Sequence, residues 1–242
     1  MTITLRKLLL AGIAACATMA ALPQAAVAGP VYSFTVRTAN QAGVQFDATN
    51  TAPGFNSAGA ITATFNYSGP LSFNIGPPQN NNNAGDLNST FFGANAAGIS
   101  GYVGSGTLGS PAGANFNTLA SFLASSGSAS GYQYGSLYTV ALGVLAAGTR
   151  LTITHDDGVS VFQGATRIGT TTAGPTSEIT ESVVLASTGA TTLYYGRQNG
   201  APSVLTVTVP EPASIALFGA GLLGLAAFRR RRSAKLGGTA AA

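Results

Sequence analysis

From about residue 30 to residue 209, apolar and polar residues alternate along the chain instead of recurring at helical spacing. In the stretch ITATFNY, the apolar members Ile61, Ala63, Phe65 and Tyr67 fall on one face of a strand and the polar members on the other. Many short stretches of this kind, separated by Gly and Asn, predict an all-β fold, an antiparallel β-sandwich or jelly roll. The expected elements are strands at 31–36, 61–67, 71–75, 136–145, 150–154, 159–163, 179–185, 191–195 and 203–209, one short helix at 117–125 and a polar loop at 76–85.

The N-terminus has the pattern of a secretory signal peptide. Two basic residues precede an apolar run at 8–22, and the small residues Ala26 and Ala28 occupy the positions before a cleavage site. Signal peptidase is therefore expected to cut before Gly29 and to remove a helical leader of residues 1–28.

A second interpretation of the leader is a lipoprotein signal. The sequence Ile13-Ala14-Ala15-Cys16 would place a lipid on Cys16, but cleavage there would leave an apolar stub on the mature protein. Cys16 is the only cysteine of the chain. With the whole leader removed, the mature protein cannot form disulfides, thiolate metal sites or cysteine nucleophiles.

Charge is concentrated at the two ends of the sequence. The chain has a formal net charge of +4, but between Gly29 and Val209 it has four cations and six anions, a net charge of about −2. Binding of a nucleic acid needs Lys and Arg clustered on one surface. The exported part of the chain is therefore not expected to bind nucleic acid.

An uncharged run of small and apolar residues at 213–228 lies between a Pro-Glu-Pro sequence and four arginines. As a transmembrane helix it would rise about 24 Å, and the arginine stems could extend its reach across a ~30 Å hydrocarbon core. The positive charge places the residues that follow on the cytoplasmic side. Gly219, Gly221 and Gly224 match G-x-G-x-x-G, but the strand and the acidic residue of a dinucleotide site are missing.

The order of Pro-Glu-Pro, apolar helix and arginine cluster resembles the PEP-CTERM sorting signal. This resemblance implies a Gram-negative bacterial product that is held in the inner membrane, processed by an exosortase near Pro-Glu-Pro, and moved to the cell surface or beyond. It implies an exported domain at 29–209, a sorting segment at 210–232 and a cytoplasmic tail at 233–242. An ordinary C-terminal anchor is the alternative. The residues expected to act in sorting are Val209, Pro210, Glu211, Pro212, Arg229, Arg230, Arg231 and Arg232.

The most informative internal segment is RLTITHDDGVSVFQG, at 150–164. Its alternation breaks at Asp156-Asp157-Gly158, which predicts a hairpin with a tight turn. The two carboxylates repel each other unless a positive group lies beside them, and a hard cation such as Ca²⁺ would relieve the repulsion. Because two ligands are too few for Ca²⁺, further oxygen atoms would have to come from elsewhere.

The sequences THDDGVSVFQG and ESVVLASTGATTLYYGRQNGAPSVLTVTV are similar to the β-sandwich domain first described in the protective-antigen toxin component and found in flocculins and glycosidases. The similarity covers residues 136–209. In carbohydrate-binding members the adjacent aspartates hold Ca²⁺, which implies Asp156 and Asp157 as ligands and Asn199 as the loop asparagine that completes the site. In other members the aspartates are structural, and this alternative implies a turn without a ligand.

No arrangement of residues predicts catalysis. His155 is the only histidine and lies next to two acids, but strand alternation does not place it on the same face as Asp156. Glu178 and Glu181, three residues apart, are expected on opposite faces of a strand, unlike the paired carboxyls of a glycosidase. The tyrosines could stack on sugars but are better explained as part of the sheet.

Together these features predict an exported, non-enzymatic protein of the cell surface or extracellular matrix, in the exopolysaccharide and biofilm setting that the sorting signal implies. The alternative is a calcium-dependent carbohydrate-binding module of lectin or adhesin type. A secreted hydrolase is the least favoured interpretation. The expected partners are signal peptidase, an exosortase and the inner membrane, with exopolysaccharide or other glycans as ligands and Ca²⁺ as the one cofactor considered.

Overall fold

The computed structural model describes residues 29–40, 44–55, 60–75, 87–108, 115–125, 134–198 and 202–209, together with Gly221. The expected leader, the polar loop at 76–85 and nearly all of the sorting segment lie outside these residues. No helix within the described ranges is both long and apolar enough to cross a membrane.

Strands make up most of the described chain. They are β1 (Val31–Asn40), β2 (Ile61–Ser68), β3 (Leu71–Ile75), β4 (Ile99–Ser105), β5 (Tyr134–Leu145), β6 (Arg150–Asp156), β7 (Val159–Gln163), β8 (Thr166–Ile168), β9 (Ile179–Val184), β10 (Gly189–Arg197) and β11 (Ser203–Thr208). The short helical segments are α2 (Leu87–Phe92), the 3-10 helix η2 (Gly93–Gly98) and α3 (Leu119–Ala124).

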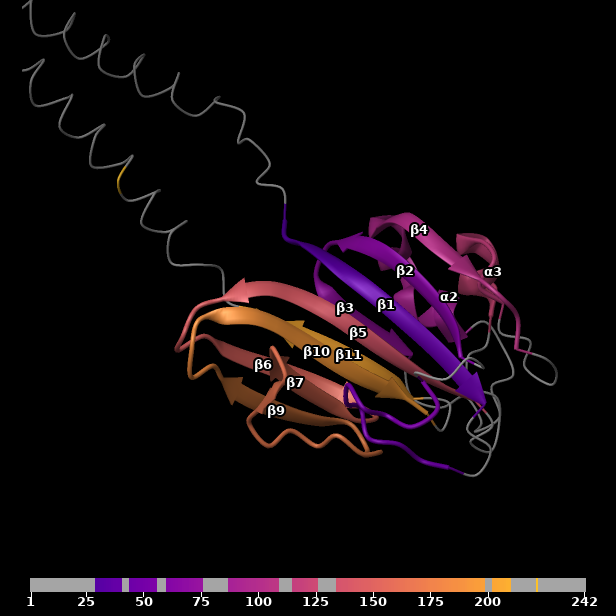
Figure 1. Cartoon of the computed structure of the whole chain (residues 1–242). Helices are drawn as coiled ribbons and strands as arrows, with labels where there is room; N and C mark the ends of the chain where they lie inside the picture. Colours follow the sequence, from indigo (N-terminus) through magenta and orange to yellow (C-terminus); the bar gives the residue numbers. More distant parts are fainter. Residues whose placement is uncertain are drawn as a thin grey trace, which may run out of the picture. The chain divides into compact units, whose positions relative to one another are not determined.

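The strands form two antiparallel sheets that stack face to face (Figure 1). The larger sheet has seven strands in the order β4-β2-β1-β5-β10-β7-β8, and the smaller has four in the order β3-β11-β6-β9. All pairings within them are antiparallel. The predicted all-β antiparallel sandwich is confirmed.

The alternating pattern located most strands correctly. Strands β3 and β7 begin and end at the expected residues, whereas β1 and β5 extend beyond them. The expected helix at 117–125 is α3, and its start is fixed by Thr118, whose hydroxyl accepts a hydrogen bond from the Ser121 backbone N–H at 3.0 Å.

The pattern missed β4, β8, α2 and η2. Strand β4 has the sequence ISGYVGS, in which Ile99 alone is buried, so it shows no apolar alternation. Strand β8 has three residues, and the two helical segments have six each, too few for a helical period to be recognised.

The predicted hairpin at Asp156-Asp157-Gly158 is wrong. Strand β6 belongs to the smaller sheet, where it pairs with β11 and β9, whereas β7 belongs to the larger sheet, where it pairs with β10 and β8. Asp-Gly chemistry fits any sharp change of direction, so it could not distinguish a hairpin from a crossing. We call residues 156–158 the corner, because the chain passes there from one sheet to the other.

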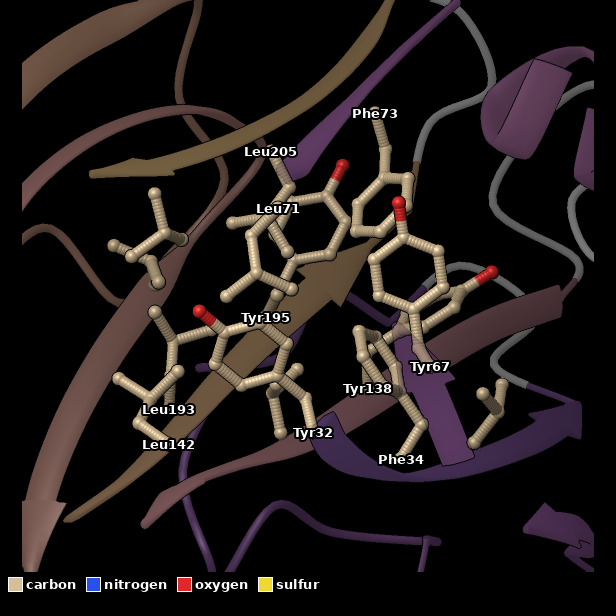
Figure 2. Close-up of a cluster of buried hydrophobic side chains, with 14 of the residues drawn as sticks. Tyr32, Phe34, Tyr67, Leu71, Phe73, Tyr138, Leu142, Leu193, Tyr195 and Leu205 are labelled. Carbon is tan, nitrogen blue, oxygen red and sulfur yellow. The ribbon is translucent and has the colours of Figure 1, made fainter. Parts of the chain in front are cut away.

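The main core lies between the sheets and is rich in aromatic rings. The ring of Phe34 in β1 is 5.1 Å from that of Phe65 in β2 and 6.0 Å from that of Phe73 in the opposite sheet. Figure 2 shows Phe34 and Phe73 together with Tyr138 and Tyr195, both of which are fully buried. These two tyrosines are therefore part of the packing, as expected, and are not available to sugars.

Two further segments complete the packing. Helix α2 supplies Phe91, whose ring stacks 5.9 Å from that of Tyr195, and Phe92, whose ring lies 5.1 Å from that of Phe73. The segment 44–55 forms a second small cluster, in which the rings of Phe46 and Phe55 are 4.4 Å apart. This segment approaches the corner and becomes part of the candidate site.

Replacement of Phe73 by Ala is expected to lower the free energy of unfolding by about 3–5 kcal/mol, because Phe73 is fully buried among aromatic rings. Val103→Ala is the control, since Val103 is 68% exposed on the edge strand β4 and its loss should change stability by less than about 0.5 kcal/mol. Urea unfolding followed by circular dichroism measures both. Equal effects of the two substitutions would contradict this account of the core.

Candidate functional site

The corner brings together the titratable residues that the sequence singled out. The exposed fractions of His155, Asp156 and Asp157 are 0%, 6% and 3%. All three are therefore buried, although strand alternation would have turned one of the first two outward. Since buried charges need partners, the neighbours of each side chain define what the corner can do.

His155 is held by acceptors on both sides of its ring. Its Nδ1 lies 2.6 Å from the carbonyl oxygen of Asp157, and its Nε2 lies 2.9 Å from Oε2 of Glu181 in β9. A carbonyl oxygen can only accept, so Nδ1 donates to Asp157. The ring is thus fixed between the backbone of the corner and the carboxyl group of Glu181.

Glu181 is kept ionised by its donors. The backbone N–H of Thr172 donates to Oε2 at 2.8 Å, and the Thr172 hydroxyl donates to Oε1 at 3.1 Å. Burial alone would raise the pKa of Glu181, but the hydrogen bonds from Thr172 and His155 outweigh it and lower the pKa from its usual value of 4.5. The pair thus joins β6, β9 and the segment 171–174.

Asp157 has the most perturbed carboxyl group of the site. Its pKa is raised from 3.8 to about 8. Desolvation by burial is the largest cause and the charge of Asp156 also raises the pKa, while the hydrogen bond from Gln198 and the charge of Arg197 lower it. The backbone N–H of Gln198 donates to Oδ2 at 2.8 Å. Arg197 is itself fully buried, with Nη1 donating to the Tyr138 hydroxyl at 3.1 Å.

The carboxyl group of Asp156 has different neighbours from that of Asp157. The pKa of its carboxyl is raised from 3.8 to about 6. Desolvation is the largest cause and repulsion from Glu178 also raises the pKa, while the charge of His155 and a hydrogen bond from the Glu178 backbone lower it. The Tyr195 hydroxyl donates to the Asp156 carbonyl oxygen at 2.5 Å. The bond between Asp156 and Asp157 is a cis peptide.

Glycine at position 158 is required by a close approach of two backbone segments. A Cβ atom there would lie 1.8 Å from the carbonyl oxygen of Ala173. The next strand is fixed to the same segment, since the Val159 N–H donates to the Thr172 carbonyl at 2.8 Å. The residue after β10 reaches the segment 44–55, because the Gln198 amide donates to the Phe46 carbonyl at 2.8 Å and accepts from the Phe46 N–H at 3.0 Å.

The raised pKa values set the pH dependence of the corner. A carboxyl whose pKa is higher in the folded than in the unfolded protein stabilises the fold when protonated, and this contribution is lost as the pH rises from the unfolded to the folded value. For Asp156 the window runs from 3.8 to about 6, and for Asp157 from 3.8 to about 8. At higher pH the corner holds two buried negative charges that a cation would stabilise.

The donors for such a cation are incomplete among the described residues. Asp156 and Asp157 bring two carboxylates together, but this part of the chain contains no group of three or more His, Cys, Asp or Glu able to hold a metal. The Gln198 amide is occupied by Phe46. Asn199, the expected third ligand, lies outside the described residues, as do Pro210, Glu211 and Pro212. Asp156 and Asp157 alone are too few ligands for Ca²⁺, which takes six to eight oxygens.

Three residues that contact the corner were not predicted from the sequence. Tyr195 holds the Asp156 carbonyl, Gln198 holds the Asp157 carboxylate, and Arg197 supplies a buried positive charge beside it. One signal could have identified Arg197, since it has the same strand parity as the apolar Leu193 and Tyr195 and so points inward with them.

Comparison with known proteins confirms the expected sorting signal. Residues 208–232 match the family model described as the PEP-CTERM protein-sorting motif, which marks the chain for exosortase-dependent export. No curated protein matches the chain.

Two solved structures show a distant similarity. One is the crystal structure of the PA14 domain of the antifreeze protein MpAFP, with 16% identity, a TM-score of 0.41, and coverage of 78% of this chain and 87% of that chain. The other is the PA14 sugar-binding domain from an RTX adhesin, with 16% identity, a TM-score of 0.39, and coverage of 75% and 90%.

Glu181→Gln is expected to destabilise the fold by about 1–3 kcal/mol at pH 7, because it removes the carboxylate that holds the ring of the buried His155 and accepts two hydrogen bonds from Thr172. Since the pKa of Glu181 is lowered on folding, its contribution is present above 4.5 and disappears as the pH falls through the folded value. Urea unfolding between pH 3 and pH 7 measures the difference. Asp47→Asn makes the same chemical change at an exposed residue and should have little effect; a similar loss in both variants would contradict the assignment.

Proposed function

We propose that this protein is a non-enzymatic component of the cell surface or extracellular matrix, delivered by signal peptidase and an exosortase. The observation that carries the proposal is the PEP-CTERM motif at 208–232, which begins in the last residue of β11. The β-sandwich is thus the domain that the motif would export, and no described helix or strand separates the two in the sequence. The proposed route passes through the inner membrane of a Gram-negative bacterium.

The composition of this domain supports a structural role outside the cell. Only 7% of all residues are charged, and the terminal segments account for many of these. Where β1 pairs with β2, most exposed positions carry hydroxyl and amide side chains, with Ser33 donating to Asn66 at 3.2 Å. A surface of this kind suits hydrated exopolysaccharide, which is the setting we propose.

The positions of the titratable groups support a non-enzymatic role. His155, the only histidine of the chain, is buried and has contacts at both ring nitrogens, so it is not placed to act as a base on a substrate. Glu181 is the hydrogen-bond partner of His155, and Glu178 lies near the buried Asp156. Neither arrangement is that of a glycosidase, in which two carboxyl groups face each other across a substrate cleft. A secreted hydrolase is therefore the least supported alternative.

Glu211→Ala is expected to block processing, so that most of the protein accumulates at full length in the inner-membrane fraction. Glu211 is the one charged residue of the Pro-Glu-Pro sequence within the matched motif. Lys235→Ala, beyond the motif, is the matched control and should be processed normally. Fractionation and immunoblotting of cells measure both. If the unaltered chain also stays at full length in the membrane, the segment is an ordinary anchor.

A second candidate function is calcium-dependent binding of glycans, and the acid pair of the corner favours it. Two carboxylates with pKa values raised to about 6 and about 8 gain stability from a nearby cation. Ca²⁺ takes six to eight oxygen ligands, so Asp156 and Asp157 would hold one side of it and leave positions for other protein oxygens and for sugar hydroxyls. Asn199 is the proposed third protein ligand.

Calcium is expected to raise the unfolding temperature relative to chelator, with a stabilisation of about 2.7 kcal/mol at a calcium concentration 100 times the dissociation constant. Because protons compete for the carboxylates, the effect should be larger at pH 8.5 than at pH 5.5. Asp157→Asn should abolish the shift, and in chelator at pH 8.5 it should be at least as stable as the unaltered protein.

Asp47→Asn is again the control, because it removes an exposed carboxylate from a segment next to the corner and should keep the calcium effect. A calcium effect that survives Asp157→Asn would place the metal elsewhere. If calcium has no effect on the unaltered protein, the acid pair is a structural corner and glycan binding through calcium is excluded, while the matrix role is unaffected.

A further inference from the structure

We propose that one end of the sandwich, where β1 begins and β11 ends, lies against the lipid surface while the C-terminal segment is held in the membrane. We call it the proximal end, and define it by Val31, Thr208 and the connections at 146–149 and 185–188. The inference rests on the proposed sorting route and adds an orientation to it. The partner is the headgroup region of the bilayer.

Strand register places the first and last strands at this common end. Val31, the first residue of β1, pairs with Ser68, and Leu71 pairs with Val207 near the end of β11. Ser68 and Leu71 are separated by two residues only, so these strand ends are neighbours. Figure 1 shows the start of β1 and the arrowhead of β5 on the same side of the sandwich.

The sequence after β11 leaves little distance between the proximal end and the membrane. Thr208 is the last residue of β11, and the apolar run of the sorting motif begins at Ala213. Five steps of fully extended chain span roughly 18 Å at most. While the apolar run is inserted, the proximal end is therefore held at the depth of the headgroups or just above them.

The side chains of the proximal end suit that position. Three of the five large apolar residues that are well exposed in the described chain lie there, namely Val31 at 63%, Val144 at 72% and Val184 at 48%. Strand β6 begins there with the exposed Arg150, which pairs with Val184 in register. Apolar side chains next to a cation are favourable at an anionic lipid surface.

The carboxylates of the described chain lie away from this end. Asp156 and Asp157 are at the far end of β6, and Glu178 precedes β9, whose first residue pairs with His155. Glu181 points toward the same histidine, and Asp47 belongs to the segment that reaches Gln198. Strand β6 has seven residues, so roughly 20 Å separate Arg150 from Asp156. The corner therefore faces away from the bilayer.

Three exposed valines at different heights provide the test. In the full chain with Cys16→Ser, single cysteines replace Val144 at the proximal end, Val103 in the middle of edge strand β4, or Val44 in the segment near the corner; these valines are 72%, 68% and 53% exposed. Each protein is labelled with an environment-sensitive fluorophore and reconstituted in phosphatidylcholine and phosphatidylglycerol vesicles that contain a nitroxide lipid at the headgroup. Circular dichroism checks the fold of each variant.

The expected result is loss of most of the fluorescence at position 144, a smaller loss at 103 and none at 44, in protein that floats with the vesicles. Equal quenching at the three positions, or none at 144, in floating protein would overturn the orientation and leave membrane delivery standing. Protein that does not float would overturn both the orientation and the membrane step on which it rests.

Discussion

The passage of the chain between the two sheets at Asp156–Gly158 is the constraint on which the rest of the structure depends. Tyr195 and Gln198 hold this corner from the larger sheet, while His155 and Glu181 hold it from the smaller. Its two acids are buried. A rise in the pKa of Asp157 from 3.8 to about 8 corresponds to a cost on the order of 5 kcal/mol for the ionised folded protein. Because whole domains are stable by about 5–15 kcal/mol, a positive charge at the corner matters to the entire fold.

The aromatic core is the second feature on which the stability of the sandwich depends. With its leader removed the chain has no cysteine, so packing has to supply the stability that disulfides give many exported domains. Rings from the larger sheet and from α2 lie within 6.0 Å of the ring of Phe73 in the smaller sheet, and Arg197 lies with its guanidinium carbon 5.6 Å from the centre of the Phe91 ring. Arg197 therefore connects the aromatic core with the corner, because it packs against Phe91 and places its charge near Asp157.

Alternation predicted the sandwich because a sheet with one buried face has a period of two, and β2 and β3 follow that period closely. It could not predict β4, because Ile99 is the one buried residue of that strand and apolar and polar positions do not alternate in it. It could not predict the partner of β6 either, because strand pairing depends on residues far apart in the sequence. The acid pair of the candidate site was visible in the sequence. Its setting was not, since a turn motif does not reveal whether the next strand joins the same sheet or the opposite one.

Topology also decides which way the corner faces. In an antiparallel sandwich each strand runs from one end to the other, so residues at the end of a strand lie opposite those at its start. Strand β6 runs against β11, from which the chain continues into the sorting motif. The acids at the end of β6 must therefore lie opposite the exit of the chain. With the reverse direction they would lie beside that exit and, in the orientation proposed above, next to lipid phosphates, which compete for a divalent cation and repel carboxylates. The direction of β6 thus separates the buried acids of the corner from the end at which the chain continues into the sorting motif.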